Sequence, residues 1–226
     1  MPLLLLIAFL AACFYLPSLW VKWVLKRHDQ PRDDFPGTGG ELAAHFVERL
    51  SLTGVSVEET SLGDHYNPAT KTVGLSKEVF HGRSLTAVTV ATHEIGHAIQ
   101  HADGYAALET RTRWAETVVK GQKVGAALLM LSPIVIVILK VPAAGLLTAL
   151  GGFLVLGLGA LMHLVTLPTE LDASFNRALP LLETGYIPDA DMPAAKSILR
   201  AAAFTYVASA LATFVNIWMW LRLLRR

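Results

Sequence analysis

The amino-acid sequence predicts a mainly α-helical integral membrane protein with about four transmembrane helices and a small α+β domain outside the bilayer. The first supporting observation is composition. Of the 226 residues, 53% are hydrophobic and 16% are charged, whereas soluble domains typically carry about 25% charged residues. The second is patterning, because the apolar residues fall in long runs with almost no charge. Together they exclude an ordinary soluble domain, and the net charge of +1 gives no indication of a nucleic-acid partner.

Long apolar runs place the predicted spans, since a helix needs about 20 apolar residues to cross a bilayer. Residues 3–25 contain one charged residue, Lys22, and residues 124–167 contain only Lys140. The second run is long enough for two spans, so we expect a helical hairpin with its tight turn at Lys140. Residues 201–221 are uncharged and supply a fourth span. Interfacial tryptophans and a basic tail end this span: Trp218, Trp220, Arg222, Arg225 and Arg226.

The first span has alternative interpretations. A cleaved signal peptide would begin with basic residues, but leucines follow directly after Met1 and Pro2, so a retained anchor is favoured. Residues 10–13 resemble a lipoprotein cleavage box in which Cys13 would be acylated, although no basic residue precedes it. Because Cys13 is the single cysteine, an intrachain disulfide is excluded.

Basic residues predict the orientation in the membrane. Lys and Arg number twelve in residues 22–123, one in the hairpin turn, three in residues 167–200 and three at the C-terminus. The positive-inside rule therefore places both polar segments in the cytoplasm and the hairpin turn outside. The C-terminal arginines conflict with this arrangement, since a fourth full span would carry them outward. The alternative is a last helix that lies along the membrane interface.

The polar segment that precedes the hairpin predicts the small α+β domain. Residues 28–40 are rich in proline, glycine and charge and are expected to form a linker. Residues 41–50 have apolar side chains at helical spacing, and residues 55–60 and 71–76 have the pattern of short strands. We expect these strands to form a β-hairpin. Two roles are open for it: an edge that holds an extended peptide by backbone hydrogen bonds, or a purely structural element.

The residues that carry chemistry lie in the uninterrupted helical stretch 84–101. His93 and His97 are four residues apart, so on a helix both imidazoles point to one side and can bind one metal ion. Glu94 directly follows the first histidine, where it can accept a proton from a water molecule at the metal. This combination is typical of a hydrolytic zinc site.

A catalytic zinc ion needs a third protein ligand, and the residues alone leave three candidates. His101 lies one more turn along the same helix, but three ligands spread over about 12 Å of helix are too extended for one ion. Glu116 follows His97 by nineteen residues, a spacing found in some soluble zinc peptidases. Glu170 begins a helix where the third span ends. Asp172 is about 200° further round that helix, so both acids cannot face one ion.

Four segments of the chain resemble the YugP-type membrane zinc metallopeptidases: residues 64–68, 73–84, 92–101 and 168–174. The resemblance covers nearly the whole chain in order. Such proteins are similar to HtpX-type and CAAX prenyl proteases, which are glutamate-zincins. In these, a membrane hairpin separates the two-histidine helix from the glutamate that completes the site.

The resemblance implies one Zn²⁺ per chain, held by His93, His97 and Glu170, with Glu94 as the general base and Glu116 as the runner-up third ligand. It also implies a zincin-like α+β metallopeptidase domain built from the HExxH helix and the β-hairpin. The predicted parts are a first transmembrane helix (1–27), the zincin-like catalytic segment (28–121), a transmembrane hairpin (122–167), the segment with the third ligand (168–200) and a fourth transmembrane or interfacial helix with a basic tail (201–226).

One residue departs from the related pattern. HtpX-type proteins carry an aspartate four residues after the ligand glutamate, where this chain has Ser174. We therefore expect the ligands to be supported by other residues: Asp172, Asn176 or Arg177. Three residues are candidates for stabilising the transition state, with turn packing or a surface charge as the alternative role of each: His65, Tyr66 and Arg83.

These inferences predict a zinc-dependent metalloendopeptidase that acts on membrane or membrane-associated proteins, with its substrate and the lipid bilayer as partners. They locate it as a multi-pass protein of the bacterial plasma (inner) membrane with a cytoplasmic active site. The alternative function is a non-catalytic zinc-binding membrane scaffold, which gives Glu94 no role. A transporter is a further alternative because His163 lies within a predicted span, although such a histidine is more often a packed helix contact.

Overall fold

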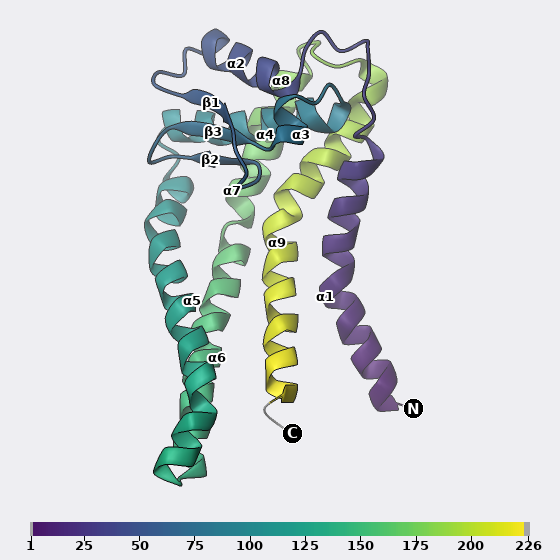
Figure 1. Cartoon of the computed structure of the whole chain (residues 1–226). Helices are drawn as coiled ribbons and strands as arrows, with labels where there is room; N and C mark the ends of the chain where they lie inside the picture. The colour runs from purple at the N-terminus through teal and green to yellow at the C-terminus, as the bar shows by residue number, and fades with distance from the viewer. Residues whose placement is uncertain (1, 224–226) are drawn as a thin grey trace. The chain divides into compact units, whose positions relative to one another are not determined.

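The computed structural model describes the backbone of residues 2–223 (Figure 1). Side chains are described for all of these except residues 2–11, 13, 14, 115, 116, 156, 158–161, 163, 164, 206 and 209–223. The chain divides into two compact units. The first comprises Met1–Ser18, Thr110–Thr166 and Tyr206–Arg226, and the second comprises Leu19–Glu109 and Leu167–Thr205.

The first unit is built from long helices: most of α1 (Pro2–Arg27) and α5 (Ala106–Leu139), α6 (Pro142–Val165) and the later part of α9 (Met192–Leu223). The predicted tight turn at Lys140 is confirmed, since α5 ends one residue before it and its φ is +54°. α5 begins at Ala106, well before the predicted span, so the polar residues that precede the span belong to the same helix. A Cβ added at Gly152 would lie 2.7 Å from the Gly125 carbonyl oxygen, so the two helix backbones are in close contact there.

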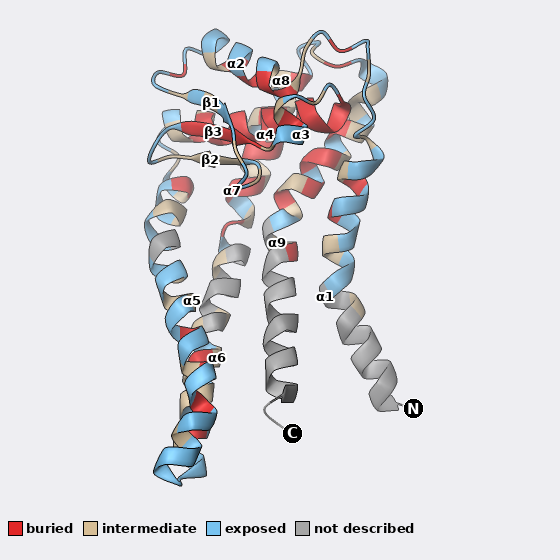
Figure 2. Ribbon diagram, in the orientation of Figure 1, coloured by how far each residue is buried: buried red, intermediate tan, exposed pale blue. Residues whose placement is uncertain are grey.

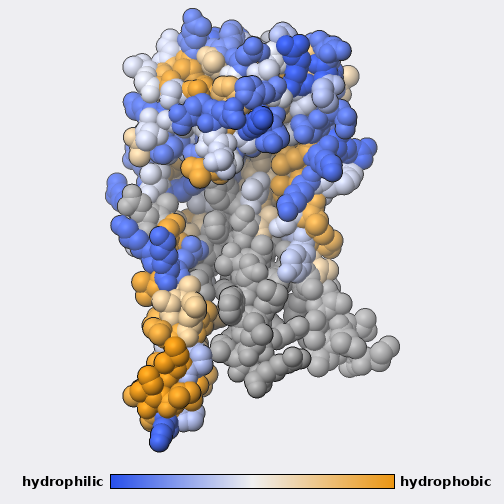
Figure 3. Space-filling model, viewed as in Figure 1, coloured by the Kyte–Doolittle hydropathy of each residue, from blue (hydrophilic) through white to orange (hydrophobic). Residues whose placement is uncertain are grey.

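α5 is long and apolar enough to cross a membrane, with a mean hydropathy of 2.0 over its most apolar stretch. Among the described residues no other helix meets that criterion, although α6 has a shorter apolar stretch, Pro142–Val155. Exposed apolar side chains of α5 and α6 form the hydrophobic surface of this pair in Figure 3. The count of four spans stays a prediction. Several residues of the membrane predictions and their alternatives lie outside the described side chains: Cys13, His163, Trp218, Trp220 and Arg222. Arg225 and Arg226 lie outside the described residues.

The second unit contains a three-stranded sheet in the order β1-β3-β2. β1 (Ser56–Glu59) pairs with β3 (Thr72–Leu75) in parallel, and β2 (His65–Asn67) pairs with β3 antiparallel. The prediction that residues 55–60 and 71–76 form a hairpin was therefore wrong, because a third strand lies between them in sequence. The chain reverses direction between β1 and β2 and again between β2 and β3, so β1 and β3 run parallel. The fully buried β3 lies between the other two strands.

Helix α4 (Leu85–Ala102) forms the core of this unit and is buried along most of its length (Figure 2). α2 (Gly39–Arg49) packs against it. Phe46 of the predicted apolar face is fully buried, whereas Leu50 follows the helix and is exposed. A capping box starts α2: Thr38 Oγ1 accepts from the Glu41 N–H at 3.2 Å, and the Glu41 carboxylate accepts from the Thr38 N–H at 2.8 Å.

Short helices complete the second unit: α3 (Lys77–Phe80), α7 (Leu167–Leu171), the π-helix η1 (Asp172–Ala178), α8 (Leu179–Leu182), the 3₁₀ turn η2 (Asp189–Asp191) and the start of α9. The π-helix η1 packs along α4. The contact is unusually close at Gly96, where an added Cβ would lie 2.4 Å from the carbonyl oxygen of Ala173. Only a glycine lets these two backbones approach so closely.

Candidate metal centre

His93, Glu94 and His97 lie in the middle of α4 and are 3%, 6% and 4% exposed. The helix places the two histidines one turn apart, and their rings meet edge-on with centroids 4.9 Å apart. Polar side chains this deeply buried must find hydrogen-bonding or ionic partners. The partner of both imidazoles comes from a different part of the chain.

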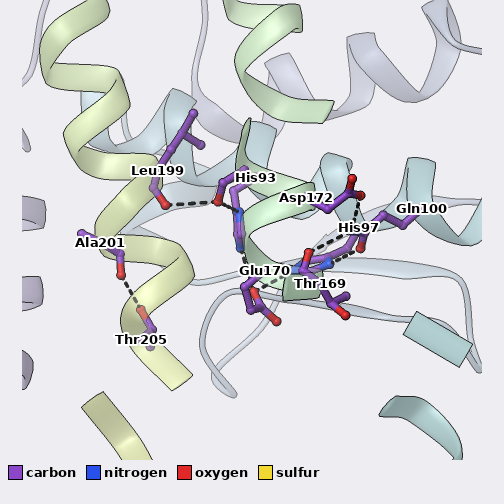
Figure 4. Close-up of polar contacts among 10 residues, drawn as sticks. His93, His97, Gln100, Thr169, Glu170, Asp172, Leu199, Ala201 and Thr205 are labelled. Carbon is purple, nitrogen blue, oxygen red and sulfur yellow. Dashed lines mark hydrogen bonds and ion pairs between the residues drawn. The ribbon is translucent and has the colours of Figure 1, made fainter. Parts of the chain in front are cut away.

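Glu170 on α7 faces both histidines and is fully buried. Its Oε2 atom lies 3.1 Å from His97 Nε2 and 3.4 Å from His93 Nε2 (Figure 4). One ligand atom from each of the three residues lies within 4.8 Å of the others. Of the three candidates for the third metal ligand, Glu170 is the one that the structure shows beside both histidines. The Glu116 side chain lies outside the described residues.

The spacing of these atoms fits a zinc ion. Zinc binds histidine nitrogen and carboxylate oxygen at about 2.0–2.2 Å in a tetrahedron, which separates neighbouring ligand atoms by about 3.3 Å. The two observed distances of 3.1 and 3.4 Å match this separation. Two imidazoles and one carboxylate are also the donor set of known catalytic zinc sites.

Ser174 fixes the orientation of His93. Its Oγ donates to the Leu199 carbonyl oxygen at 3.1 Å and lies 3.0 Å from His93 Nδ1. Because the hydroxyl has one proton, it accepts from Nδ1–H, which leaves the lone pair of Nε2 available to a metal ion on the side of Glu170. The expectation that support must come from residues other than Ser174 was therefore wrong. The Ser174 hydroxyl can accept a hydrogen bond from His93 because it donates its one proton to the Leu199 carbonyl oxygen.

Gln100 fixes His97 in the same way and was missed by the sequence analysis. Its Nε2 donates to the Thr169 carbonyl oxygen at 2.8 Å and to Asp172 at 2.7 Å. Both donors being used, the amide oxygen faces His97 Nδ1, 2.9 Å away, and accepts its proton. Its position three residues after His97, on the same helix face, was the available signal.

Asp172 has the predicted supporting role, but it acts indirectly: it accepts a hydrogen bond from Gln100, which in turn contacts His97. Asn176 donates to it at 2.8 Å, and Arg177 lies 3.4 Å away while also pairing with Asp103 at the end of α4. Desolvation of the carboxyl raises the pKa of Asp172, but hydrogen bonds from Gln100 and Asn176 together with the charge and hydrogen bond of Arg177 outweigh it and hold that pKa below its usual value. The network therefore joins η1 to the C-terminal end of α4, beyond His97.

A family model described as "Putative neutral zinc metallopeptidase" matches residues 3–225 of the chain. The chain belongs to this family. A curated relative, "Putative membrane protease YugP" of Bacillus subtilis (strain 168), is 32% identical over 207 residues, which cover 88% of each chain. The predicted resemblance to YugP-type proteins is confirmed. No solved structure matches the chain.

The three candidates for stabilising a transition state differ in position within the second unit. Tyr66 lies opposite Val73 in the sheet and its hydroxyl is 2.7 Å from Nδ1 of His101, one turn beyond His97. Burial raises the pKa of Tyr66, so the phenol stays a hydrogen-bond donor. His65 instead contacts the Gly63 carbonyl oxygen at 2.8 Å, as expected of turn packing, and the Arg83 side chain is exposed.

Replacing Ser174 with alanine or Gln100 with leucine is expected to weaken zinc binding about 10- to 100-fold, because each histidine loses the acceptor that fixes its ring. Competition with a chromophoric chelator measures the affinity. Thr92→Val is the matched control, since Thr92 is fully buried beside His93 but bonds only the Val88 carbonyl of its own helix. Affinity unchanged in both variants would contradict these positioning roles.

Proposed function

We propose that this chain is a membrane-bound zinc endopeptidase in which His93, His97 and Glu170 hold one zinc ion. The observation that carries the proposal is the convergence of these three buried ligand atoms within 4.8 Å from two distant parts of the chain. Family membership supports the choice of zinc and of peptide hydrolysis. The fixed Nδ1–H tautomers support it as well, because each histidine then offers Nε2 as a ligand.

Bound zinc would lower the pKa of a water molecule to about 7 and polarise the scissile carbonyl. Glu94 is the general base: its carboxylate accepts the proton of the attacking water and passes it to the nitrogen of the leaving amine. Its place on α4 directly after His93 keeps it beside the ligands without using it as one. Burial of the site keeps bulk water from competing for these hydrogen bonds.

The proposed substrate is an extended peptide segment of a membrane or membrane-associated protein. β2 is an edge strand of the described sheet and packs against α4, the helix that carries the metal site. An edge strand can bind an extended chain by backbone hydrogen bonds with little demand on its side chains. The Tyr66 phenol, on the same strand, is the proposed donor to the developing oxyanion.

The membrane setting belongs to the same proposal. The relative from Bacillus subtilis is called a membrane protease, and α5 can cross a bilayer by length and composition. We extend this to about four spans, with the metal site on the cytoplasmic side, from the distribution of basic residues.

Exchange of single carboxylates tests the ligand set. Glu170→Gln is expected to lose stoichiometric zinc, since the amide keeps the size of this buried side chain but is a far weaker zinc ligand. Glu116→Gln, which changes the competing candidate identically, is expected to retain one zinc per chain. Metal content of the purified proteins measures both. The reverse result would assign the third ligand to Glu116 and overturn the proposed site.

A further inference from the structure

The last turns of α1 carry exposed aromatic and basic side chains. Trp20 and Trp23 are 37% and 56% exposed, and Lys22, Lys26 and Arg27 are also exposed. The Arg27 guanidinium carbon lies 5.0 Å from the ring centre of Trp23. Indole rings and cations at the end of an apolar helix are typical of a membrane interface.

Helix α9 adds a fourth cation to the same surface. Phe204 on α9 meets Trp20 edge-on, with ring centroids 6.4 Å apart. Arg200 lies one turn before Phe204 and is exposed. These parts of α1 and α9 belong to the second compact unit. Residues four apart share a helix face, so Arg200 lies on the same side of α9 as Phe204, the side that faces α1.

Among the described residues, no acidic side chain pairs with any of these four cations: Lys22, Lys26, Arg27 and Arg200. Neighbouring polar groups have other partners. Lys196 on α9 pairs with Glu183 at 3.4 Å, and Asp29 accepts from Ser84 at 2.8 Å. No ion pair among the described residues therefore neutralises these four cations, and together they complement an anionic partner.

Exposed apolar residues next to the cations identify the partner as lipid rather than an acidic soluble protein. Leu16 and Leu19 precede the basic turn on α1 and are 59% and 58% exposed. From Leu19 onward, the exposed side chains of α1 are first aliphatic, then aromatic with Lys22 between the two tryptophans, and finally basic. A bilayer changes from hydrocarbon to interface to charged headgroup in the same order.

The basic turn is joined directly to the metal helix. Thr86, in the first turn of α4, donates from Oγ1 to the Leu25 carbonyl oxygen at 2.7 Å and from N–H to the His28 carbonyl oxygen at 3.2 Å. His93 follows Thr86 by seven residues, which is about 10 Å of helix. The depth of the α1 end therefore sets the depth of the metal ligands.

We propose that Trp20, Lys22, Trp23, Lys26, Arg27 and Arg200 bind the headgroups of anionic phospholipids and thereby hold the metal helix at the membrane surface. This inference rests on the membrane-bound function proposed above and makes it more specific. Peptide bonds within reach are those close to the bilayer, so the substrate class narrows to juxtamembrane segments.

Lipid selectivity tests the proposal on the full chain in vesicles of phosphatidylcholine and phosphatidylglycerol. Tryptophan quenching by brominated forms of each lipid gives their relative affinity, in a background with Trp114, Trp218 and Trp220 replaced by phenylalanine. The unaltered surface is expected to favour phosphatidylglycerol. Lys22→Gln combined with Lys26→Gln is expected to reduce that preference about 30-fold. Adding Arg27→Gln and Arg200→Gln is expected to abolish it.

The matched control is Lys71→Gln with Lys77→Gln, which removes two exposed cations elsewhere in the same unit and is expected to keep the preference. Equal affinity for the two lipids before substitution, or a preference that survives all four substitutions, would overturn the proposal. The same measurement on zinc-free Glu170→Gln protein separates the two proposals. If the Glu170→Gln protein keeps its preference for phosphatidylglycerol and the unaltered protein shows no peptidase activity, only the proposed enzymatic function is overturned.

Discussion

Glu94→Gln is expected to abolish peptide hydrolysis while the protein keeps its zinc. Glutamine has the shape of glutamate, so the 6% exposed side chain is replaced without a cavity, but it cannot accept a proton from water. General-base catalysis contributes about 10²- to 10⁴-fold to rates, and we expect kcat to fall by about 10³-fold or more. Hydrolysis of casein, an unfolded protein, measures the loss, and metal analysis measures the retained zinc.

The control for this substitution is Glu78→Gln, the same change at an exposed position on α3. It is expected to leave both readouts unaltered. Turnover by Glu94→Gln at the native rate would remove Glu94 from the mechanism. Loss of hydrolysis in Glu94→Gln with full zinc content would also exclude the alternative of a non-catalytic zinc-binding scaffold, because a scaffold has no activity to lose.

The histidine pair could be predicted because its geometry is local. Two side chains four residues apart on a helix face the same way whatever surrounds them, and the uninterrupted apolar stretch 84–101 predicts that helix. The structure places His93 and His97 with both rings turned to Glu170. The approach of Glu170, seventy-three residues beyond His97, depends on tertiary packing, so spacing alone left it among three candidates.

The supporting residues were predicted less well, for a physical reason. Ser174 was set aside because a serine stands where related proteins carry an aspartate. Its hydroxyl can accept from His93 only because the Leu199 carbonyl takes its proton. That carbonyl lies on α9, and a backbone group has no signature in the sequence. Gln100 likewise becomes a support only once Thr169 and Asp172 occupy its amide protons.

The parallel pairing of β1 and β3 could not be predicted either. β2 has three residues, each of intermediate exposure, so it lacks the alternation by which strands are found. Its existence depends on β3, whose fully buried backbone needs partners on both sides. A short strand that satisfies a neighbour's hydrogen bonds is a tertiary feature. Overlooking it changed the predicted pairing of the two longer strands.

Gly96→Ala is expected to damage the metal site although it favours the helix that carries it. Alanine in place of a mid-helix glycine favours helix formation by about 1 kcal/mol. Here the new Cβ would lie 2.4 Å from the Ala173 carbonyl oxygen, so η1 must move away from α4. Overpacking of this kind costs about 1–3 kcal/mol. Ala173 is three residues from Glu170, and the displacement therefore draws this ligand from the histidines.

Two measurements distinguish this strain from an ordinary helix effect. Zinc affinity by chelator competition is expected to fall at least about tenfold, as it does when the support of a ligand is lost, and thermal stability of the zinc-free protein is expected to fall as well. Gly151→Ala on α6 is the matched control, because nothing lies within 4 Å of its added Cβ and stability should hold or rise. A Gly96→Ala protein that gains stability and binds zinc normally would show that the α4–η1 contact does not position Glu170.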